Sequence, residues 1–287
     1  MANGSRDDSL CIDRIRNGLS AIADEVCTEI ELFSEIDSTN RWLLEQAPPI
    51  AGTMRSAVAD YQTRGRGRRG RRWELPPGAG ICLSVAWTFA DRPAHISSLA
   101  LAIGVASVAA LDSVGCTGVK LKWPNDLIYS DGKLGGILVE SIGTAEPRCT
   151  IVVGIGINRI LPAGFSETIK QGEKLAPTDL ARAFAGGAPP SRNEIVAALI
   201  SGFAVAFREF SANGFVNFRP SWQALDYLSG RTVEVTRGEN RMTGRANGIG
   251  EAGELLVAAQ GNGPTIVSID SGSVTPLDAS DAAVPDA

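Results

Sequence analysis

Hydrophobic residues follow two different patterns along this chain, and each pattern predicts its own kind of structure. Nearly continuous apolar runs bounded by turn residues are typical of buried strands, and they lie at 55–62, 80–89 and 150–157. A shorter alternating run at 30–33 and another at 119–121 predict two more strands. The stretch from His95 to Val114 is apolar on nearly all sides, which predicts a central helix packed between layers.

Helical patterns lie between these strands. Residues 10–26 carry a loose apolar stripe, and Ser38 is a good N-cap for a helix that ends before Pro48. The sequence from Ser191 to Glu194 reads as a capping box and opens a long helix to about Ala212. Shorter helices are expected at 178–184 and 220–227.

Turn residues between short apolar runs predict two kinds of β structure. Asp131-Gly132 separates runs at 127–129 and 133–140, which is a strong hairpin signal. After residue 230 the sequence pattern changes and predicts short strands at near-regular spacing, which is typical of a small β-barrel. Those strands are expected at 231–235, 241–246, 253–258 and 264–269.

Composition and charge narrow the class of protein. The chain has 287 residues, is 44% hydrophobic and 21% charged, and carries a net charge of −5. These are ordinary values for a globular protein, whereas a dedicated nucleic-acid binder usually has a basic domain. The five cysteines form no C-x-x-C pair, which favours a reducing compartment without disulfides or a zinc site. We find neither a signal peptide nor an uninterrupted apolar membrane span, and the single histidine, His95, is expected at a helix start on the surface.

The most unusual stretch is RGRGRRGRRW, from Arg64 to Trp73, between two predicted core strands. Arginine forks bind phosphate in a bidentate manner, and glycines let the backbone approach an anion closely. Taken alone, the stretch fits a phosphate-binding loop, a solvated basic surface loop or an arginine-glycine tract for RNA. The acidic remainder of the chain favours a small anionic ligand.

Three further groups of polar or small residues follow the predicted strands. Ser38-Thr39-Asn40 offers short polar side chains and free amides at a helix start, which suits a neutral head group such as a urea. Pro124 denies strand pairing, so Asn125 and Asp126 are expected at a bend, with Lys133 across the hairpin. Each group also has a purely structural interpretation: a helix cap, a bend or an edge lysine.

Glycines inside two predicted strands indicate a close approach above the sheet. Gly135-Gly136 and Gly154-x-Gly156-x-Asn158 would weaken their strands unless something has to come near the backbone. The second pattern does not complete the G-x-G-x-x-G of a dinucleotide-binding fold, and no Walker motif is present.

In combination these motifs resemble those of the biotin protein ligases. The similar stretches are S-T-N at 38–40, Y-Q-x-x-G-R-G-R-R-G-R-x-W at 61–73, K-W-P-N-D at 122–126, K-L-G-G-I-L-V-E at 133–140 and G-I-G-I-N at 154–158. The resemblance implies an α+β fold: a mixed-sheet catalytic domain of the biotin/lipoate ligase type with helices packed on the sheet, followed by a small SH3-like β-barrel. The expected divisions are a lead-in at 1–33, a catalytic domain at 34–224, the barrel at 225–278 and a flexible tail at 279–287.

The resemblance also implies a reaction in two halves. Biotin attacks the α-phosphate of ATP, with Mg²⁺ on the phosphates, to give biotinyl-5′-AMP and pyrophosphate. A lysine of a biotin carboxyl carrier domain then attacks the mixed anhydride. The implied enzyme is cytoplasmic, a monomer or weak homodimer, and binds neither membrane nor DNA, since residues 1–33 hold too little chain for a winged-helix domain.

Roles follow by position in the matching motifs. The resemblance assigns Lys133, Arg66 and Arg68 to catalysis and assigns the biotin site to Ser38, Thr39, Asn40, Gln62, Arg66, Gly67, Arg68, Lys133, Gly135 and Gly136. It assigns Arg69, Arg71, Trp73, Asn125, Asp126 and Asn158 to the adenylate side, with Asp126 nearest the metal and no protein ligand fixed. An arginine loop repels itself when empty, so we expect it to order over an anionic ligand.

Two alternatives remain open at this point. A lipoate ligase or octanoyltransferase of the same superfamily would share the fold, although the arginine loop, K-W-P-N-D and the barrel argue against it. An RNA-binding module using the arginine tract would bind with a steep salt dependence.

Overall fold

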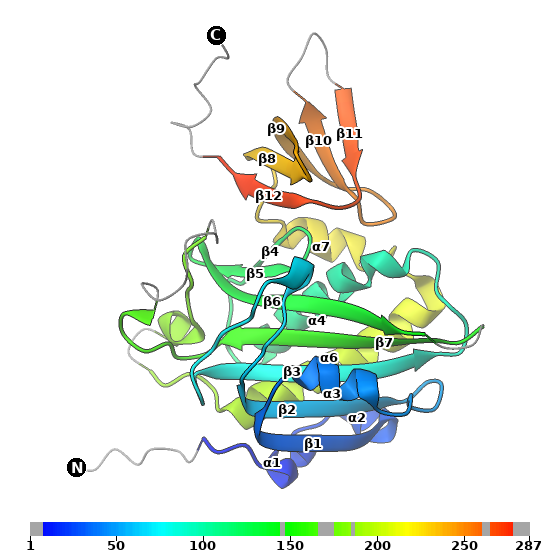
Figure 1. The fold of residues 1–287 in the computed structure, drawn as a ribbon, viewed down its shortest axis with the longest axis vertical. Helices are drawn as coiled ribbons and strands as arrows, with labels where there is room; N and C mark the ends of the chain where they lie inside the picture. The colour runs from blue at the N-terminus through cyan, green and yellow to red at the C-terminus, as the bar shows by residue number, and fades with distance from the viewer. Residues whose placement is uncertain (1–7, 144–146, 166–174, 185–186, 260–264, 278–287) are drawn as a thin grey trace.

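A seven-stranded mixed sheet forms the centre of the larger part of the molecule. The computed structural model describes residues 8–143, 147–165, 175–184, 187–259 and 265–277 (Figure 1). The strand order is β1-β2-β3-β7-β6-β5-β4, with β1 and β2 parallel and every other neighbouring pair antiparallel. The strands are β1 Cys27–Ile36, β2 Met54–Gln62, β3 Gly80–Phe89, β4 Lys120–Lys122, β5 Asp126–Tyr129, β6 Gly132–Ile142 and β7 Cys149–Asn158. The predicted strands are confirmed, and β1 is longer than its alternating core suggested.

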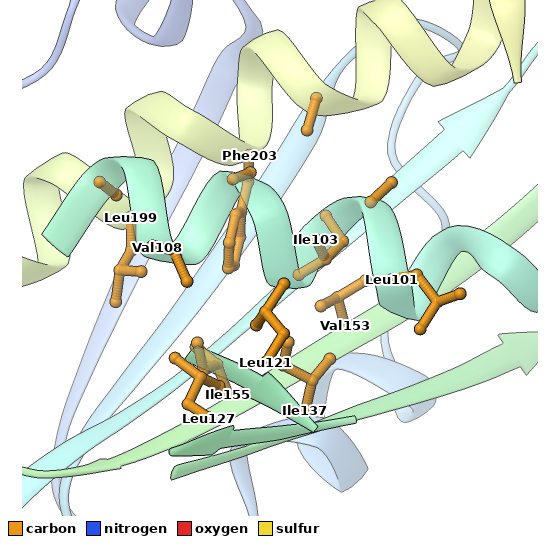
Figure 2. Packing of buried hydrophobic residues seen from close by; sticks show 14 of the residues in the cluster. Leu101, Ile103, Val108, Leu121, Leu127, Ile137, Val153, Ile155, Leu199 and Phe203 are labelled. Carbon is orange, nitrogen blue, oxygen red and sulfur yellow. The ribbon is translucent and has the colours of Figure 1, made fainter. Parts of the chain in front are cut away.

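Most of the helices cover one face of this sheet. The central helix α4 (Leu99–Ser113) lies between the strands and α6 (Arg192–Asn213), as Figure 2 shows for Ile103, Phe203 and Val153. The helices α1 (Ile12–Asn17) and α2 (Ala21–Val26) pack against α6 on the same side. Because α4 contacts protein on two sides, its sequence is apolar all round, as predicted.

On the opposite face, the short helix α3 (Thr39–Glu45) covers part of the area. Leu43 of α3 packs on Ala57, Ala86 and Val152, which are small or medium side chains on that face of the sheet. The rest of the face is left to the polar and glycine positions of the sequence motifs. Because the helices bury one face of the sheet, a ligand site can lie on the opposite face.

The N-terminal helix predicted over 10–26 is two helices, so that prediction is wrong in one respect. The chain turns at Gly18, where a Cβ atom would come within 2.9 Å of the Ala197 Cβ atom of α6. Ser20 then caps α2, since its hydroxyl accepts a hydrogen bond from the Ala23 amide. Close packing on α6 and a strong N-cap signal at Ser20 together override the continuous apolar stripe.

The hairpin and the capping box are confirmed. Ser130 and Asp131 form the turn between β5 and β6 with φ values of 47° and 58°, as a two-residue turn of the I′ type requires. Ser191 and Glu194 make both reciprocal bonds of the capping box at the start of α6. The predicted short helices are the 3₁₀ turn Leu180–Phe184 and α7 (Arg219–Leu225).

The C-terminal part is a five-stranded antiparallel sheet with the order β11-β10-β9-β8-β12. Its strands are β8 Thr232–Arg237, β9 Asn240–Ile249, β10 Leu255–Ala259, β11 Thr265–Ile269 and β12 Ser273–Pro276. Four strands were predicted and β12 was missed, because its sequence has one buried apolar residue, Val274. No pairing between β11 and β12 closes the sheet among the described residues, so a closed barrel is not confirmed. The tail at 279–287 lies outside the described residues.

Two helical segments have the length and hydropathy of membrane spans, which the sequence pattern did not suggest. They are Ile96–Ser113 and α6, with mean hydropathies of 1.7 and 1.6. Protein buries 61% and 56% of their apolar windows, however, so core packing accounts for their hydrophobicity.

Candidate active site

A cavity of about 360 Å³ lies on the face of the sheet that α3 covers only in part, beneath the C-terminal sheet. That volume is within the usual range for small-molecule sites. The cavity brings together fourteen of the sixteen residues predicted for the site, from four separate motifs. They are Ser38, Thr39, Asn40, Gln62, Arg66, Gly67, Arg68, Arg69, Arg71, Trp73, Asn125, Asp126, Lys133 and Gly136.

The start of α3 forms a polar wall of this cavity. Ser38 caps the helix by accepting a hydrogen bond from the Arg41 amide, so its structural interpretation is correct as well. The Thr39 amide donates to the Gln62 side chain at 2.8 Å, and the Thr39 hydroxyl lies 2.6 Å from that of Ser84. Ser84 donates to the Asn40 carbonyl oxygen at 2.5 Å. Thr39 and Asn40 are nearly fully buried, so these bonds hold them rigidly.

Two glycines of β7 make room for side chains that lie flat on the sheet. A Cβ atom on Gly154 would be 2.1 Å from the Asn40 carbonyl oxygen, and one on Gly156 would be 2.3 Å from the Trp73 indole. Any larger residue at either place would displace the side chain above it. The close approach predicted for this glycine pattern is therefore real, and here the approaching groups are the protein's own site residues.

The arginine stretch forms a narrow ribbon that crosses the face of the sheet toward the C-terminal sheet (Figure 1). Its two arms are joined by hydrogen bonds from Gly67 to Arg71 and from Trp73 to Gly65. A Cβ atom on Gly65 would lie 2.2 Å from the Trp73 carbonyl oxygen, so that glycine permits the ribbon to close on itself.

Three arginines of the ribbon each reach a different element. Arg66 pairs with Glu140 of β6 at 2.9 Å, Arg68 donates to the Asn125 side chain at 2.9 Å, and Arg69 donates to Ser273 of β12 at 2.8 Å. Burial and the neighbouring arginines lower the pKa of Arg68, although Asp126 partly opposes this. A guanidinium held in such a place favours the arrival of an anion.

Lys133 and Lys122 share one carboxylate at the base of the cavity. Their ammonium groups lie 3.4 Å and 3.3 Å from the two oxygens of Asp126. Burial by itself would raise the pKa of Asp126, but the two lysines outweigh it and hold the pKa below its usual range. Among these three side chains, one negative charge faces two positive charges.

The cavity as a whole is strongly basic within an acidic chain. Among the described residues that line it, eight are lysine or arginine and two, Asp126 and Glu234, are acidic. A cavity that concentrates positive charge in this way attracts and holds a small anion.

Gly135 and Asn158 are the two predicted site residues that do not line the cavity. A Cβ atom on Gly135 would lie 2.5 Å from the Gly156 carbonyl oxygen, so this glycine serves the packing of β6 on β7. The Asn158 carboxamide donates to the carbonyl oxygens of Lys133 and Thr178 at 3.2 Å and 2.8 Å. The structure places Asn158 behind Lys133, where it fixes the backbone that carries the lysine.

Sequence reasoning gave no role to several residues that the structure places at the site. Lys122 and Glu140 stand at the ends of quoted motifs, and Ser84 is the polar residue within a buried apolar strand. The C-terminal sheet contributes Glu234, Thr236, Arg241 and Ser273 to the lining. Ser84 could have been found, because a buried polar residue in a strand needs a partner; the contribution of the C-terminal sheet has no local signal.

The described residues contain no group of three or more histidine, cysteine, aspartate or glutamate side chains able to hold a metal ion. Asp126, the residue predicted nearest the metal, has lysines as its partners. The described side chains at this place therefore do not form a metal site of their own.

Comparisons with known proteins agree with this fold and site. Residues 32–158 match the sequence profile of the biotin/lipoate A/B protein ligase family. The bifunctional ligase/repressor of Escherichia coli is 36% identical over 81% of this chain and 70% of its own length. The biotin–[acetyl-CoA-carboxylase] ligase of Mycobacterium tuberculosis is 31% identical over 87% of this chain and 89% of its own length.

A solved structure extends the likeness to three dimensions. The biotin protein ligase of Aquifex aeolicus, solved in complex with biotin and ATP, superposes with a TM-score of 0.70 at 27% identity. The match covers 87% of this chain and 100% of that one. The fold and site thus define a ligase of the biotin/lipoate class. Within that class, the chain belongs to the biotin protein ligase family.

Proposed function

We propose that this chain activates biotin with MgATP to biotinyl-5′-AMP and transfers the biotinyl group to a lysine of a biotin carboxyl carrier domain. The observation that carries the proposal is a basic cavity that a rigid polar wall at Thr39, Lys133 and the arginine ribbon line together. Family membership and the relatives' names point to the same reaction.

The residues of the cavity have separate tasks in this proposal. The wall formed by Ser38, Thr39, Asn40 and Gln62 takes the urea head group of biotin, since it offers short polar groups and little charge. Lys133 lies between that wall and the ribbon, where it stabilises the charge that develops as the carboxylate attacks the α-phosphate. Arg66 and Arg68 neutralise the same anions, and Arg69 and Arg71 hold the phosphates further along.

The magnesium ion enters as part of the substrate MgATP. The fixed positive charge of Lys122, Lys133 and the arginines supplements the ion in neutralising the phosphates. Trp73, packed on Gly156 with Lys133 Nζ at 5.8 Å from its ring centroid, is proposed to bound the adenylate. Asn125 and Asp126 position Arg68 and the two lysines.

The remaining parts of the chain receive proposed roles as well. Residues 34–224 are proposed as the catalytic domain and 225–278 as an SH3-like domain that covers the cavity from above, with 1–33 as lead-in. Cytoplasmic location fits the five free cysteines of the described structure. The lack of operator binding and the monomeric or weakly dimeric state stay predictions, for gel-shift and sedimentation measurements.

Pyrophosphate release with different acids tests the proposal against its nearest alternative. The chain is incubated with MgATP and, in separate reactions, with biotin, lipoate or octanoate. We expect release with biotin at a rate far above that with the other two acids. Release that depends on lipoate or octanoate in preference to biotin would instead assign the chain to the lipoate branch of the family.

A further inference from the structure

A continuous chain of side chains connects the arginine ribbon to the polar wall, and two of its residues, Glu140 and Ser84, have no role in the function proposed above. Arg66 and the Asn40 amide nitrogen bind the two carboxylate oxygens of Glu140 at 2.9 Å and 3.0 Å. Asn40 continues to Ser84, and Ser84 continues to Thr39. Thr39 meets Gln62, which stands four residues before Arg66 along the chain, so the connection closes into a ring.

Because each hydroxyl has only one proton to donate, the donors and acceptors of this ring follow one another in a fixed direction. An ionised carboxylate can only accept, so the NH₂ group of Asn40 has to face Glu140 and its carbonyl oxygen has to face Ser84. A carbonyl oxygen also only accepts, so the 2.5 Å contact uses the single proton of the Ser84 hydroxyl. The 2.6 Å contact between the hydroxyls of Ser84 and Thr39 must then use the proton of Thr39, in preference to the longer contact of 3.1 Å from that hydroxyl to the Gln62 carbonyl oxygen.

The consequence lies at the cavity wall. With its proton committed to Ser84, the Thr39 hydroxyl can meet a ligand only as an acceptor. The Gln62 carbonyl oxygen accepts from the Thr39 amide at 2.8 Å and lies 3.1 Å from the Thr39 hydroxyl oxygen, so this oxygen too is an acceptor at the wall. A wall that presents acceptors suits a head group that donates N–H hydrogen bonds, as a cyclic urea does. When the ligand has no N–H group, these acceptors stay unpaired.

We propose that Glu140 is a positioning residue that fixes the proton direction of the wall through Asn40 and Ser84, so that Thr39 selects ligands with an N–H donor. This inference rests on the proposed biotin site and names the part of it that distinguishes biotin from a dithiolane or alkyl acid. Sites built to bind a donor reject analogues that lack it, because buried acceptors stay unpaired.

The geometry around Glu140 fits this role. Asn40 and Ser84 are 4% and 1% exposed, so water does not compete for their protons. Gly154 leaves room for the Asn40 carbonyl oxygen directly on β7, since a Cβ atom there would be 2.1 Å from that oxygen. Glu140 stands on β6 with Gly136 and Leu138, on the same face as the cavity.

The test compares Glu140→Gln with Glu74→Gln by steady-state pyrophosphate release. Glu74 also pairs with a ribbon arginine, Arg72, but is exposed and has no contact with the ring, so it is a matched control. A carboxamide side chain at position 140 can donate as well as accept hydrogen bonds, so it no longer fixes the orientation of the Asn40 side-chain amide. We expect the KM for biotin to rise about tenfold in Glu140→Gln with the KM for ATP within about twofold, and no change in Glu74→Gln.

A double-mutant cycle with Ser84→Ala separates a relay from a general structural effect. Removing Ser84 cuts the ring between Glu140 and Thr39, so the effect of Glu140→Gln on the biotin KM should largely disappear in that background. Fully additive effects, or equal increases in both KM values with a lower Tm, would overturn the inference. If the Ser84→Ala variant does not fold, the single variant Glu140→Gln tests the inference. A biotin KM equal to that of the wild type would then overturn the inference.

The outcomes also separate this inference from the proposed function. A wild-type chain that releases no pyrophosphate with biotin contradicts the function and, with it, the inference. A wild-type chain that is active with biotin, together with a Glu140→Gln variant that keeps wild-type KM and the wild-type preference for biotin over lipoate, contradicts the inference alone.

Discussion

The Nζ atom of Lys133 lies 3.4 Å from Oδ1 of Asp126, while Lys122 occupies the other oxygen of the same carboxylate. This shared carboxylate holds Lys133 in place without cancelling its charge. Asp126 by itself neutralises only one of the two ammonium groups that face it. Several consequences for activity and stability can be measured.

Lys133→Ala should abolish most adenylate formation. Removing a preorganised charge at the reacting atoms typically costs about 10²–10³ in kcat. Stopped-flow or coupled measurement of pyrophosphate release at saturating biotin and MgATP checks this. Lys120→Ala is the control, because Lys120 stands on the edge strand β4 and donates to the Ala224 carbonyl oxygen outside the cavity. Full activity in Lys133→Ala would place the catalytic charge elsewhere.

Gly156→Ala should weaken binding by moving Trp73. A methyl group there would approach to 2.3 Å of the indole, so the ring must leave the sheet and occupy part of the cavity. We expect a rise of at least about tenfold in the KM for ATP, measured by pyrophosphate release, with a modest loss of stability. Gly143→Ala is a suitable control, since nothing lies within 4 Å of a Cβ atom there. Equal kinetics in the two variants would remove Trp73 from the adenylate side.

Arg69 and Ser273 should act together across the two parts of the molecule. Their 2.8 Å hydrogen bond is a direct link between the ribbon and the C-terminal sheet. In a double-mutant cycle of Arg69→Ala and Ser273→Ala, we expect a coupling free energy of about 0.5–1.5 kcal/mol in kcat/KM for ATP. Strict additivity of the two substitutions would mean that the C-terminal sheet covers the cavity without holding the ribbon.

Asp226 should make stability depend on pH. Burial raises its pKa to about 6, although the Leu228 amide opposes the shift. A raised pKa means that the folded state binds a proton more tightly, so this contribution is present below about pH 4 and is lost as pH rises through about 6. Asp226→Asn keeps the bond from Leu228 and avoids burying a charge.

The measurement for this residue is urea unfolding of wild type and Asp226→Asn at pH 4.5 and pH 7.5. We expect the variant to be more stable at the higher pH by about 1–2 kcal/mol, after allowance for solvent screening of a partly exposed group. The difference should shrink at the lower pH, where wild type is protonated. A difference that does not change with pH would show that this carboxyl is ionised in both conditions.

Local patterns were enough to predict most of the larger sheet and its helices. Apolar runs such as 80–89 correspond to β3 residue by residue, and the Ser191–Glu194 signature marks the start of α6. These predictions succeeded because burial patterns and helix capping are set by residues close in sequence. The break at Gly18 was missed, since it depends on contact with Ala197, which lies far along the chain.

The site residues divide in the same way, into those that a local motif reveals and those that depend on contacts between distant segments. Motifs identified the residues that bear charge, but the roles of Glu140 and Ser84 depend on pairing across β3, β6 and α3, which no local pattern contains. The lining contributed by Glu234 and Arg241 depends on how the C-terminal sheet lies over the cavity. Asn158 was assigned by motif to the ligand, whereas its hydrogen bonds go to the backbone at Lys133 and Thr178.

The central claim is transfer of biotin to protein, and intact mass spectrometry of an acceptor tests it most directly. A biotin carboxyl carrier domain is incubated with this chain, biotin and MgATP, with parallel reactions that lack ATP or that contain the acceptor with its target lysine replaced by arginine. We predict a mass increase of one biotinyl group in the complete reaction and none in the two controls. An acceptor of unchanged mass in the complete reaction, with the chain folded and the acceptor competent for a known ligase, would contradict the account.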